Sequence, residues 1–290
     1  MNQAAKLREL FSKKDLTVIA GAHNGLSAKL VEQAGFDGVW ASGLEISASY
    51  GVPDASFISM YQFVETARSM CEVIDIPIIV DCDTGYGNAM NVMYMIKRYE
   101  AAGVAAVSIE EKKFPKDNSL LANGRQELLR VDEFEGKIEA AKAAQKNPDF
   151  MVIARIEALI AGYGQEEAQM RAHRYANAGA DAILIHSKSN DPAEVVEFIN
   201  DWDLDIPLVL VPTKYPTLKE NDIIELGKVK MVIYANHGLR VSIRSMETIF
   251  KKIKEDGGIY DIDELIVPMS TVFELQGVPE LKENEKKFLR

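Results

Sequence analysis

Eight short apolar runs, each followed by a longer segment of helical character, most constrain how this chain can fold. The runs are rich in Val, Ile and Ala and lie at 17–23, 38–43, 76–83, 104–111, 150–157, 180–187, 206–213 and 229–236. Continuous apolar strands that alternate with helices are typical of a parallel sheet covered by helices. An open doubly wound sheet would usually use about five or six strands and leave the others unexplained. We therefore predict an α/β fold, a closed (β/α)8 barrel of the TIM type.

The segments that flank the eight runs are predicted to be helical additions to this barrel. A helix precedes the first run, and no linker rich in Pro, Gly or Ser divides the chain, so we expect one domain over residues 1–290. Terminal helices are expected over 239–276. Their apolar residues at helical spacing are Ile262, Leu265, Ile266, Met269, Val272, Phe273 and Leu275. This face could dock on a second subunit or on the chain's own barrel, and the sequence leaves both open.

Charge and composition exclude several classes of partner. The chain has 33 Lys and Arg against 44 Asp and Glu, a net charge of −11, which would repel nucleic acid and anionic membranes. No apolar run reaches the roughly 18 residues that a membrane span needs, and the polar start lacks a secretory signal. Two cysteines without CxxC spacing fit a reducing compartment. We expect a cytoplasmic protein that binds neither nucleic acid nor membrane.

Acidic residues close two neighbouring apolar runs, where an active site of this fold is expected. Asp81 and Asp83 end the third run, and strand alternation places them on one side, with Cys82 packed on the other. Glu110 ends the fourth run. Three converging carboxylates form an all-oxygen site that suits Mg²⁺ or Mn²⁺ with several waters retained. Helix capping or pairing with Lys and Arg is the structural alternative.

Two other interpretations of the segment DCDTGYGNAM fail on its residues. An EF-hand loop would need an acidic residue where Val92 stands. The dinucleotide fingerprint would need a third glycine where Met90 stands, and two aspartates would crowd the pyrophosphate. The glycines more plausibly shape a tight turn above the metal.

Basic and polar residues predict an anion pocket opposite these acids. Arg155 and His186 end the fifth and sixth runs, and together with a metal they could hold a small anion. Residues 111–130 form a long polar connection, which in this setting suggests a gating loop. The loop contributes Lys116, Asn118 and Ser119, donors suited to a phosphoryl or carboxylate group once it closes.

Five motifs together resemble the isocitrate lyase and phosphoenolpyruvate mutase superfamily, and within it the phosphoenolpyruvate mutases. They are VDCDTGYG at 80–87, IEEKKFPKDNS at 109–119, VIARIEALIAGYG at 152–164, ADAILIHSK at 180–188 and LVPTKY at 210–215. The resemblance covers nearly the whole chain. It implies a (β/α)8 barrel with a C-terminal helix swapped between subunits, a homodimer or homotetramer, and Mg²⁺. It also implies interconversion of phosphoenolpyruvate and phosphonopyruvate, three-carbon phosphorylated acids, at the entry to phosphonate biosynthesis.

The resemblance also assigns residue roles. Asp81 would ligate Mg²⁺ directly, and Asp83 and Glu110 would hold its waters. Asp54 matches the family's essential aspartate, either a nucleophile or an electrostatic support for a dissociative transfer. Trp40, Ser42, Gly43 and Leu44 would line the site, with the Gly43 and Leu44 amides on the substrate carboxylate. The groups that would hold the phosphoryl, and the gating-loop lysine that would help shut out water, are Asn118, Ser119, Arg155, His186 and Lys116.

Related activities separate at a few positions. The carbon–carbon lyases of the superfamily use a cysteine in the loop, whereas KKFPKDNS contains none. Phosphonopyruvate hydrolases, as the resemblance has it, carry Thr where this chain has Asn118 and Arg where it has His186. These two residues favour the mutase, and the hydrolase is the alternative. Glu111 departs from the aspartate common at its position.

Overall fold

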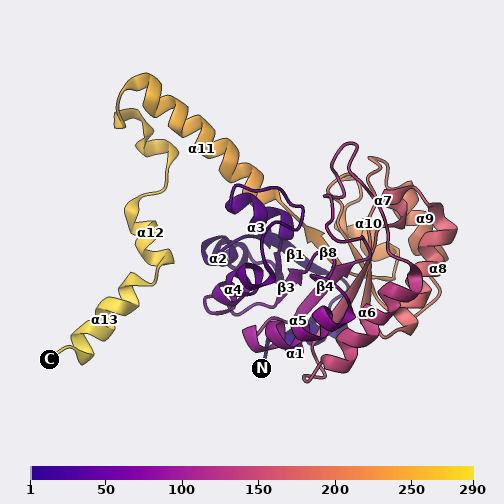
Figure 1. The fold of residues 1–290 in the computed structure, drawn as a ribbon. Helices are drawn as coiled ribbons and strands as arrows, with labels where there is room; N and C mark the ends of the chain where they lie inside the picture. Colours follow the sequence, from indigo (N-terminus) through magenta and orange to yellow (C-terminus); the bar gives the residue numbers. More distant parts are fainter. Residues whose placement is uncertain (1) are drawn as a thin grey trace. The chain divides into compact units, whose positions relative to one another are not determined.

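The computed structural model describes residues 2–290, and its strands close into the predicted barrel (Figure 1). All eight strands are parallel and pair in chain order, with β8 returning to β1. The (β/α)8 prediction is therefore confirmed, and every predicted run contains one strand. The strands are β1 Thr17–Ala22, β2 Gly38–Ala41, β3 Ile78–Asp81, β4 Ala106–Glu110, β5 Met151–Ile156, β6 Ala182–Ile185, β7 Leu208–Leu210 and β8 Val229–Tyr234.

Helices connect the strands and cover the outside of the barrel (Figure 1). Most of them bury one apolar face against the sheet, as α5 does with Val92, Met95, Ile96 and Tyr99. The helices of the barrel are α1 Gln3–Lys13, α2 Gly25–Gln33, α3 Gly43–Ser49, α4 Met60–Cys71, α5 Ala89–Ala102, α6 Val131–Ala144, α7 Ala158–Ala161, α8 Gly164–Asn177, α9 Ala193–Asp201 and α10 Glu220–Glu225.

The core has two layers because strand side chains alternate between the barrel interior and the helices. Ile79, Ile153 and Leu184 belong to the inner layer, which also takes in the fully buried Leu7 of α1. The predicted N-terminal helix therefore packs against the interior of the barrel. Cys82 belongs to the outer layer, fully buried between sheet and helices, as predicted.

The chain divides into two compact units, the second being Gly238–Arg290. This part contains most of α11 His237–Asp256, the 3₁₀ helix η1 Tyr260–Leu265, α12 Met269–Leu275 and α13 Val278–Phe288. No residue of α11, α12 or α13 is buried. Large apolar side chains, including Phe250, Met269 and Phe273, are exposed. Helix swapping and assembly into dimers or tetramers stay predictions.

Among residues 2–290, no helix combines the length and the apolar character that crossing a bilayer would require. The cytoplasmic location stays a prediction.

Candidate active site

The carboxyl ends of the strands meet at one rim of the barrel and enclose a small cavity of about 50 Å³. A buried water needs roughly 10–15 Å³ of such space, so the cavity has room for only a few waters. The loop 111–130 covers it, and the structure therefore has the closed form of the site. The predicted residues that line the cavity are Trp40, Ser42, Leu44, Asp54, Asp81, Lys116, Asn118, Ser119, Arg155 and His186.

The remaining predicted residues, Gly43, Asp83 and Glu110, lie just behind this wall. A Cβ atom on Gly43 would stand 3.1 Å from Asp81 Oδ2 and 3.1 Å from Asp83 Oδ1, so the start of α3 packs directly on both carboxylates. Glu110 is almost fully buried at the end of β4. Leu120, Val211, Thr213, Ala235 and Asn236 complete the lining.

Four carboxylates surround one ammonium group on one side of the rim, and we call Asp54, Asp81, Asp83, Glu110 and Lys116 the acidic cluster. The Lys116 Nζ lies 2.7 Å from Asp83 Oδ1, 3.1 Å from Asp54 Oδ1 and 3.8 Å from Glu110 Oε1. Burial alone would lower the pKa of Lys116, but the carboxylates hold it well above its usual range. Burial and the neighbouring acids raise the pKa of Asp83 to about 7 against the attraction of Lys116. The acidic cluster thus carries more negative charge than Lys116 alone can neutralise.

Asp83 reaches this cluster through a turn and not through strand alternation. β3 ends at Asp81, and Asp83 has a left-handed backbone with φ of 49°. Its backbone N–H donates to Asp81 Oδ1 at 3.2 Å. Aspartate tolerates this conformation better than most residues do. The two carboxylates share one side, as predicted, but for a different local reason.

The donor chemistry of the acidic cluster fits a divalent cation. Asp54 Oδ1, Asp83 Oδ1 and both Glu110 carboxylate oxygens are buried and accept no hydrogen bond within residues 2–290. Over the same residues, no three His, Cys, Asp or Glu side chains form a ready-made set of metal ligands. Mg²⁺ keeps several waters and often takes only one or two carboxylates directly, so a site of this kind needs no such set. These residues suit a hydrated hard cation.

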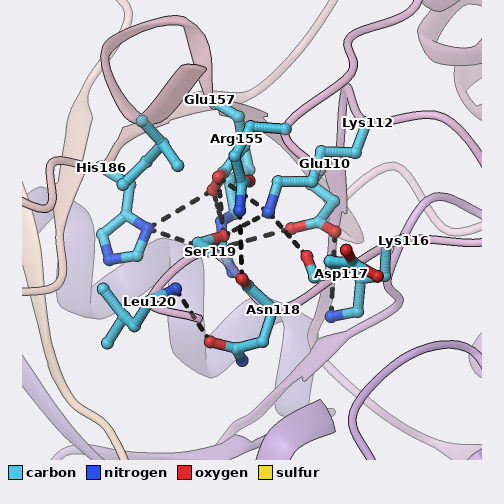
Figure 2. Close-up of polar contacts among 12 residues, drawn as sticks. Glu110, Lys112, Lys116, Asp117, Asn118, Ser119, Leu120, Arg155, Glu157 and His186 are labelled. Carbon is cyan, nitrogen blue, oxygen red and sulfur yellow. Dashed lines mark hydrogen bonds and ion pairs between the residues drawn. The ribbon is translucent and has the colours of Figure 1, made fainter. Parts of the chain in front are cut away.

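A second network centres on the fully buried Glu157, which follows β5 (Figure 2). We call Lys112, Ser119, Arg155, Glu157 and His186 the Glu157 network. Arg155 Nε donates to Glu157 Oε1 at 2.6 Å, and Ser119 Oγ donates to Glu157 Oε2 at 2.6 Å. Lys112 Nζ lies 3.3 Å from Glu157 Oε2. Burial alone would raise the pKa of Glu157, but Arg155 and Lys112 hold it well below its usual range.

The contacts of His186 determine which of its ring nitrogens carries the proton. Arg155 Nη2 lies 3.1 Å from His186 Nδ1, and a guanidinium can only donate. Glu157 Oε1 lies 3.4 Å from the same nitrogen and would need a proton there, so the shorter contact with Arg155 favours Nδ1 as the acceptor and Nε2 as the nitrogen that carries the proton of the neutral ring. Burial lowers the pKa of His186, which favours this neutral form. Since His186 lines the cavity, its Nε2–H is a donor for a bound anion.

Asn118 links the loop to the acidic cluster. Its Nδ2 donates to Asp54 Oδ2 at 2.6 Å, and its Oδ1 accepts from the Leu120 N–H at 2.9 Å. Burial alone would raise the pKa of Asp54, but Lys116 and this hydrogen bond lower it. Asp54 is therefore held as a carboxylate at the edge of the cavity.

Sequence reasoning missed Glu157, Lys112 and Glu45. The alternation of Ile153 and Arg155 extends to Glu157, and that of Glu110 extends to Lys112, so this signal was present. Glu45, in the first turn of α3, is fully buried, and its Oε1 accepts from the Asn236 N–H at 2.9 Å.

Other polar residues at strand ends serve local structure. His23 Nδ1 lies 3.2 Å from Glu45 Oε2, and Asn24 caps the start of α2.

Comparisons with known proteins agree with this architecture. Residues 7–254 match the family model described as phosphoenolpyruvate phosphomutase. The chain belongs to this family. It is accordingly an enzyme of the phosphoenolpyruvate mutase and isocitrate lyase superfamily.

Close relatives in this family have two different activities in their names. A phosphonopyruvate hydrolase of Variovorax sp. (strain Pal2) is 50% identical over 289 residues, which cover 100% of this chain and 99% of that one. The crystal structure of a phosphoenolpyruvate phosphomutase from Streptomyces platensis subsp. rosaceus is 55% identical, covers 99% of both chains and has a TM-score of 0.96. A phosphonopyruvate hydrolase structure in complex with oxalate and Mg²⁺ is 48% identical, covers 100% of both chains and has a TM-score of 0.95. Overall similarity therefore leaves the reaction open between the two.

Proposed function

We propose that this family member is a Mg²⁺-dependent phosphoenolpyruvate mutase, which interconverts phosphoenolpyruvate and phosphonopyruvate. The observation that carries the proposal is the pair Asn118 and His186, the two positions at which the hydrolases are expected to differ. Asn118 binds Asp54 at 2.6 Å, and His186 accepts from Arg155 and offers Nε2–H to the cavity. Both residues thus take part in the geometry that would hold a phosphoryl group.

The reaction breaks one P–O bond and forms one P–C bond on the same pyruvyl unit, so it consumes no water. Arg155, His186 Nε2–H and Asn118 Nδ2 supply donors for the phosphoryl oxygens as the group moves. Asp54 stands at the cavity edge, either to accept the phosphoryl or to support its transfer electrostatically. The closed loop leaves room for few waters, which protects the phosphoryl from hydrolysis.

Asp81, with Asp83 and Glu110 acting through waters, would hold Mg²⁺. When bound, the ion would supply positive charge that stabilises the enolate oxygen of the pyruvyl unit. Of the loop residues, Lys116 brings an ammonium group to the same carboxylates and ties the loop to them.

The test is ³¹P NMR of the purified protein with Mg²⁺ and phosphonopyruvate. We expect phosphoenolpyruvate to appear, and the signal to be absent with EDTA or in Asp54→Ala and Asp81→Ala. Inorganic phosphate and pyruvate as the main products would instead make this chain a hydrolase. That second candidate is favoured by the 50% identity to the Variovorax enzyme. Unchanged turnover in both variants would contradict the assignment of the site itself.

We further propose that residues 239–276 pair with a second copy of the chain, giving a homodimer or a tetramer of paired dimers. The support is the exposed apolar side chains of this segment, which include Phe250 of α11 and Met269 and Phe273 of α12. Light scattering after gel filtration should give a mass at least twice that of one chain. Phe250→Glu should shift the mass toward the monomer, and an unchanged mass would argue against this face.

A further inference from the structure

Glu157 is a buried carboxylate for which the proposed reaction assigns no part. Both of its oxygens are engaged, Oε1 by Arg155 Nε and Oε2 by Ser119 Oγ, each at 2.6 Å. Its backbone N–H donates to Glu111 Oε1 at 2.8 Å, and Glu111 Oε2 is held in turn by Arg171 Nη1 at 2.9 Å. The backbone of Glu157 is therefore held from the barrel side, while its carboxylate binds Arg155 and the loop residue Ser119.

The loop binds to the Glu157 carboxylate through the Ser119 hydroxyl, whose hydrogen-bonding positions are all occupied. Ser119 Oγ donates to Glu157 and accepts from Lys112 Nζ at 2.7 Å and from Arg155 Nη2 at 2.9 Å. A serine hydroxyl has one donor and two acceptor positions, and all three are used. In this closed form, Ser119 Oγ serves the loop and would contact a phosphoryl group only by exchanging one of these bonds.

Lys112 ties the same point to the loop backbone. Its Nζ donates to the carbonyl of Asp117 at 3.0 Å in addition to Ser119 (Figure 2). The Lys112 side chain is 1% exposed. Glu157 is thus the barrel-side partner of two loop residues that lie 45 and 38 positions earlier in the sequence, by 157 − 112 and 157 − 119. The charges of Lys112 and Arg155 both converge on it.

We propose that Glu157 is the positioning residue that holds the loop 111–130 shut and orients Arg155 toward His186. Its Oε2 retains the loop through Ser119. Its Oε1 holds the Nε edge of the guanidinium, which leaves Nη2 to donate to His186 Nδ1. Loop closure and the orientation of the anion-binding groups therefore depend on one carboxylate.

Substitution of Glu157 by Gln breaks this arrangement without changing its shape. An amide has one acceptor oxygen and cannot serve both Arg155 Nε and Ser119 Oγ. Hydrogen bonds to charged groups contribute more than neutral ones, so losing one here should shift the loop equilibrium about tenfold or more. We expect hydrogen–deuterium exchange over 112–121 to rise by about that factor in E157Q, with Mg²⁺ and oxalate present as probe ligands. Exchange in β8 should stay unchanged.

Two further variants separate a loop-holding role from a general structural one. S119A removes the hydroxyl but leaves Arg155 and Glu157 paired, and it should increase exchange over the same segment. In the double variant E157Q/S119A, the two increases in exchange should not add, because both substitutions remove the hydrogen bond between Ser119 Oγ and Glu157. E45Q removes a buried carboxylate at another part of the rim, and it should leave exchange over 112–121 as in the parent protein.

Exchange over 112–121 that stays within about twofold of the parent in both E157Q and S119A would overturn the proposal. An equal increase of exchange in β8, or of exchange over 112–121 in E45Q, would also overturn it, since either would indicate a general loosening of the barrel. A kinetic arm rests on the proposed function: E157Q should lower kcat more than it raises KM, and should raise the share of inorganic phosphate among the products. The exchange arm needs no catalysis, so failure of the mutase assignment and failure of this inference give different results.

Discussion

The acidic cluster and the Glu157 network face each other across one cavity with opposite charge patterns. In the acidic cluster, the carboxylates of Asp54, Asp83 and Glu110 lie within 4 Å of the Lys116 ammonium, and Asp81 adds a fourth negative charge. In the Glu157 network, the positive charges of Lys112 and Arg155 pair with a single carboxylate, next to the neutral ring of His186. The loop supplies Lys116 to the acidic cluster and Lys112 and Ser119 to the Glu157 network, so its closure completes both.

The two differ in how fully their polar atoms are satisfied. Asp54 Oδ1, Asp83 Oδ1 and both Glu110 oxygens accept no hydrogen bond within residues 2–290 and meet only the charges of Lys116 and Arg155, whereas both oxygens of Glu157 accept a hydrogen bond. Buried acceptors that lack a hydrogen bond are costly, and they commonly mark a place where a ligand or ion binds. The acidic cluster is therefore built for an exchangeable cation, and the Glu157 network for fixed orientation. This difference assigns cation binding to the acidic cluster and the positioning of side chains to the Glu157 network.

Asn118→Ala should have the largest effect of the three changes considered, since Asn118 joins the loop to the acidic cluster. The variant loses the 2.6 Å contact with Asp54 and a donor for the phosphoryl group. We expect kcat for phosphonopyruvate conversion to fall about 10- to 100-fold. Steady-state rates from ³¹P NMR measure the effect, and S119A, whose hydroxyl belongs to the other network, serves for comparison. Unchanged kinetics would contradict the role given to Asn118.

Much of the barrel and its rim could be predicted from the alternation of apolar runs and helices. Asp81, Glu110, Arg155 and His186 each end a buried strand, and this position alone placed them at the site. Asp54 was different, because it lies between α3 and α4 with no strand or helix period to indicate it, and only the family resemblance identified it.

The contacts of the loop could not be predicted in the same way. Lys116 meets Asp54 across 62 positions of sequence, and that contact depends on the closed conformation of the loop, which no local pattern encodes. Glu157 was within reach of strand alternation. It directly follows the strand that carries Arg155, but an acid just before a short helix also suits a capping role, so its charge alone did not mark it.

Gly43→Ala should have an intermediate effect that is confined to the acidic cluster. The new methyl group would lie 3.1 Å from Asp81 Oδ2 and from Asp83 Oδ1, closer than such atoms normally approach, so both carboxylates must move. We expect Mg²⁺ affinity, measured by calorimetry with oxalate present, to fall about tenfold.

Gly136→Ala, in α6, is the matched control for Gly43→Ala, because its new methyl group would meet nothing within 4 Å. It should raise stability by about 0.5–1 kcal/mol and leave Mg²⁺ affinity intact. Equal Mg²⁺ affinity in the two variants would show that the start of α3 does not shape the cluster.

Asp203→Asn should have the smallest effect and sets the scale for charge pairs away from the rim. His173 Nε2 lies 2.5 Å from Asp203 Oδ1, but the side chains are 32% and 74% exposed. Burial would lower the pKa of His173, yet hydrogen bonds from its ring to the Gln169 carbonyl and to Asp203 raise it above 6.5. A raised histidine pKa adds stability that is fully present below 6.5 and disappears as pH rises through the folded value. The variant should therefore be slightly less stable than the parent at about pH 5.5, and the two should converge at about pH 8.5. Thermal melts at both values measure the difference. A gap that does not change with pH would mean that the ionised pair contributes nothing. The buried networks of the rim would then differ from surface pairs in kind as well as in size.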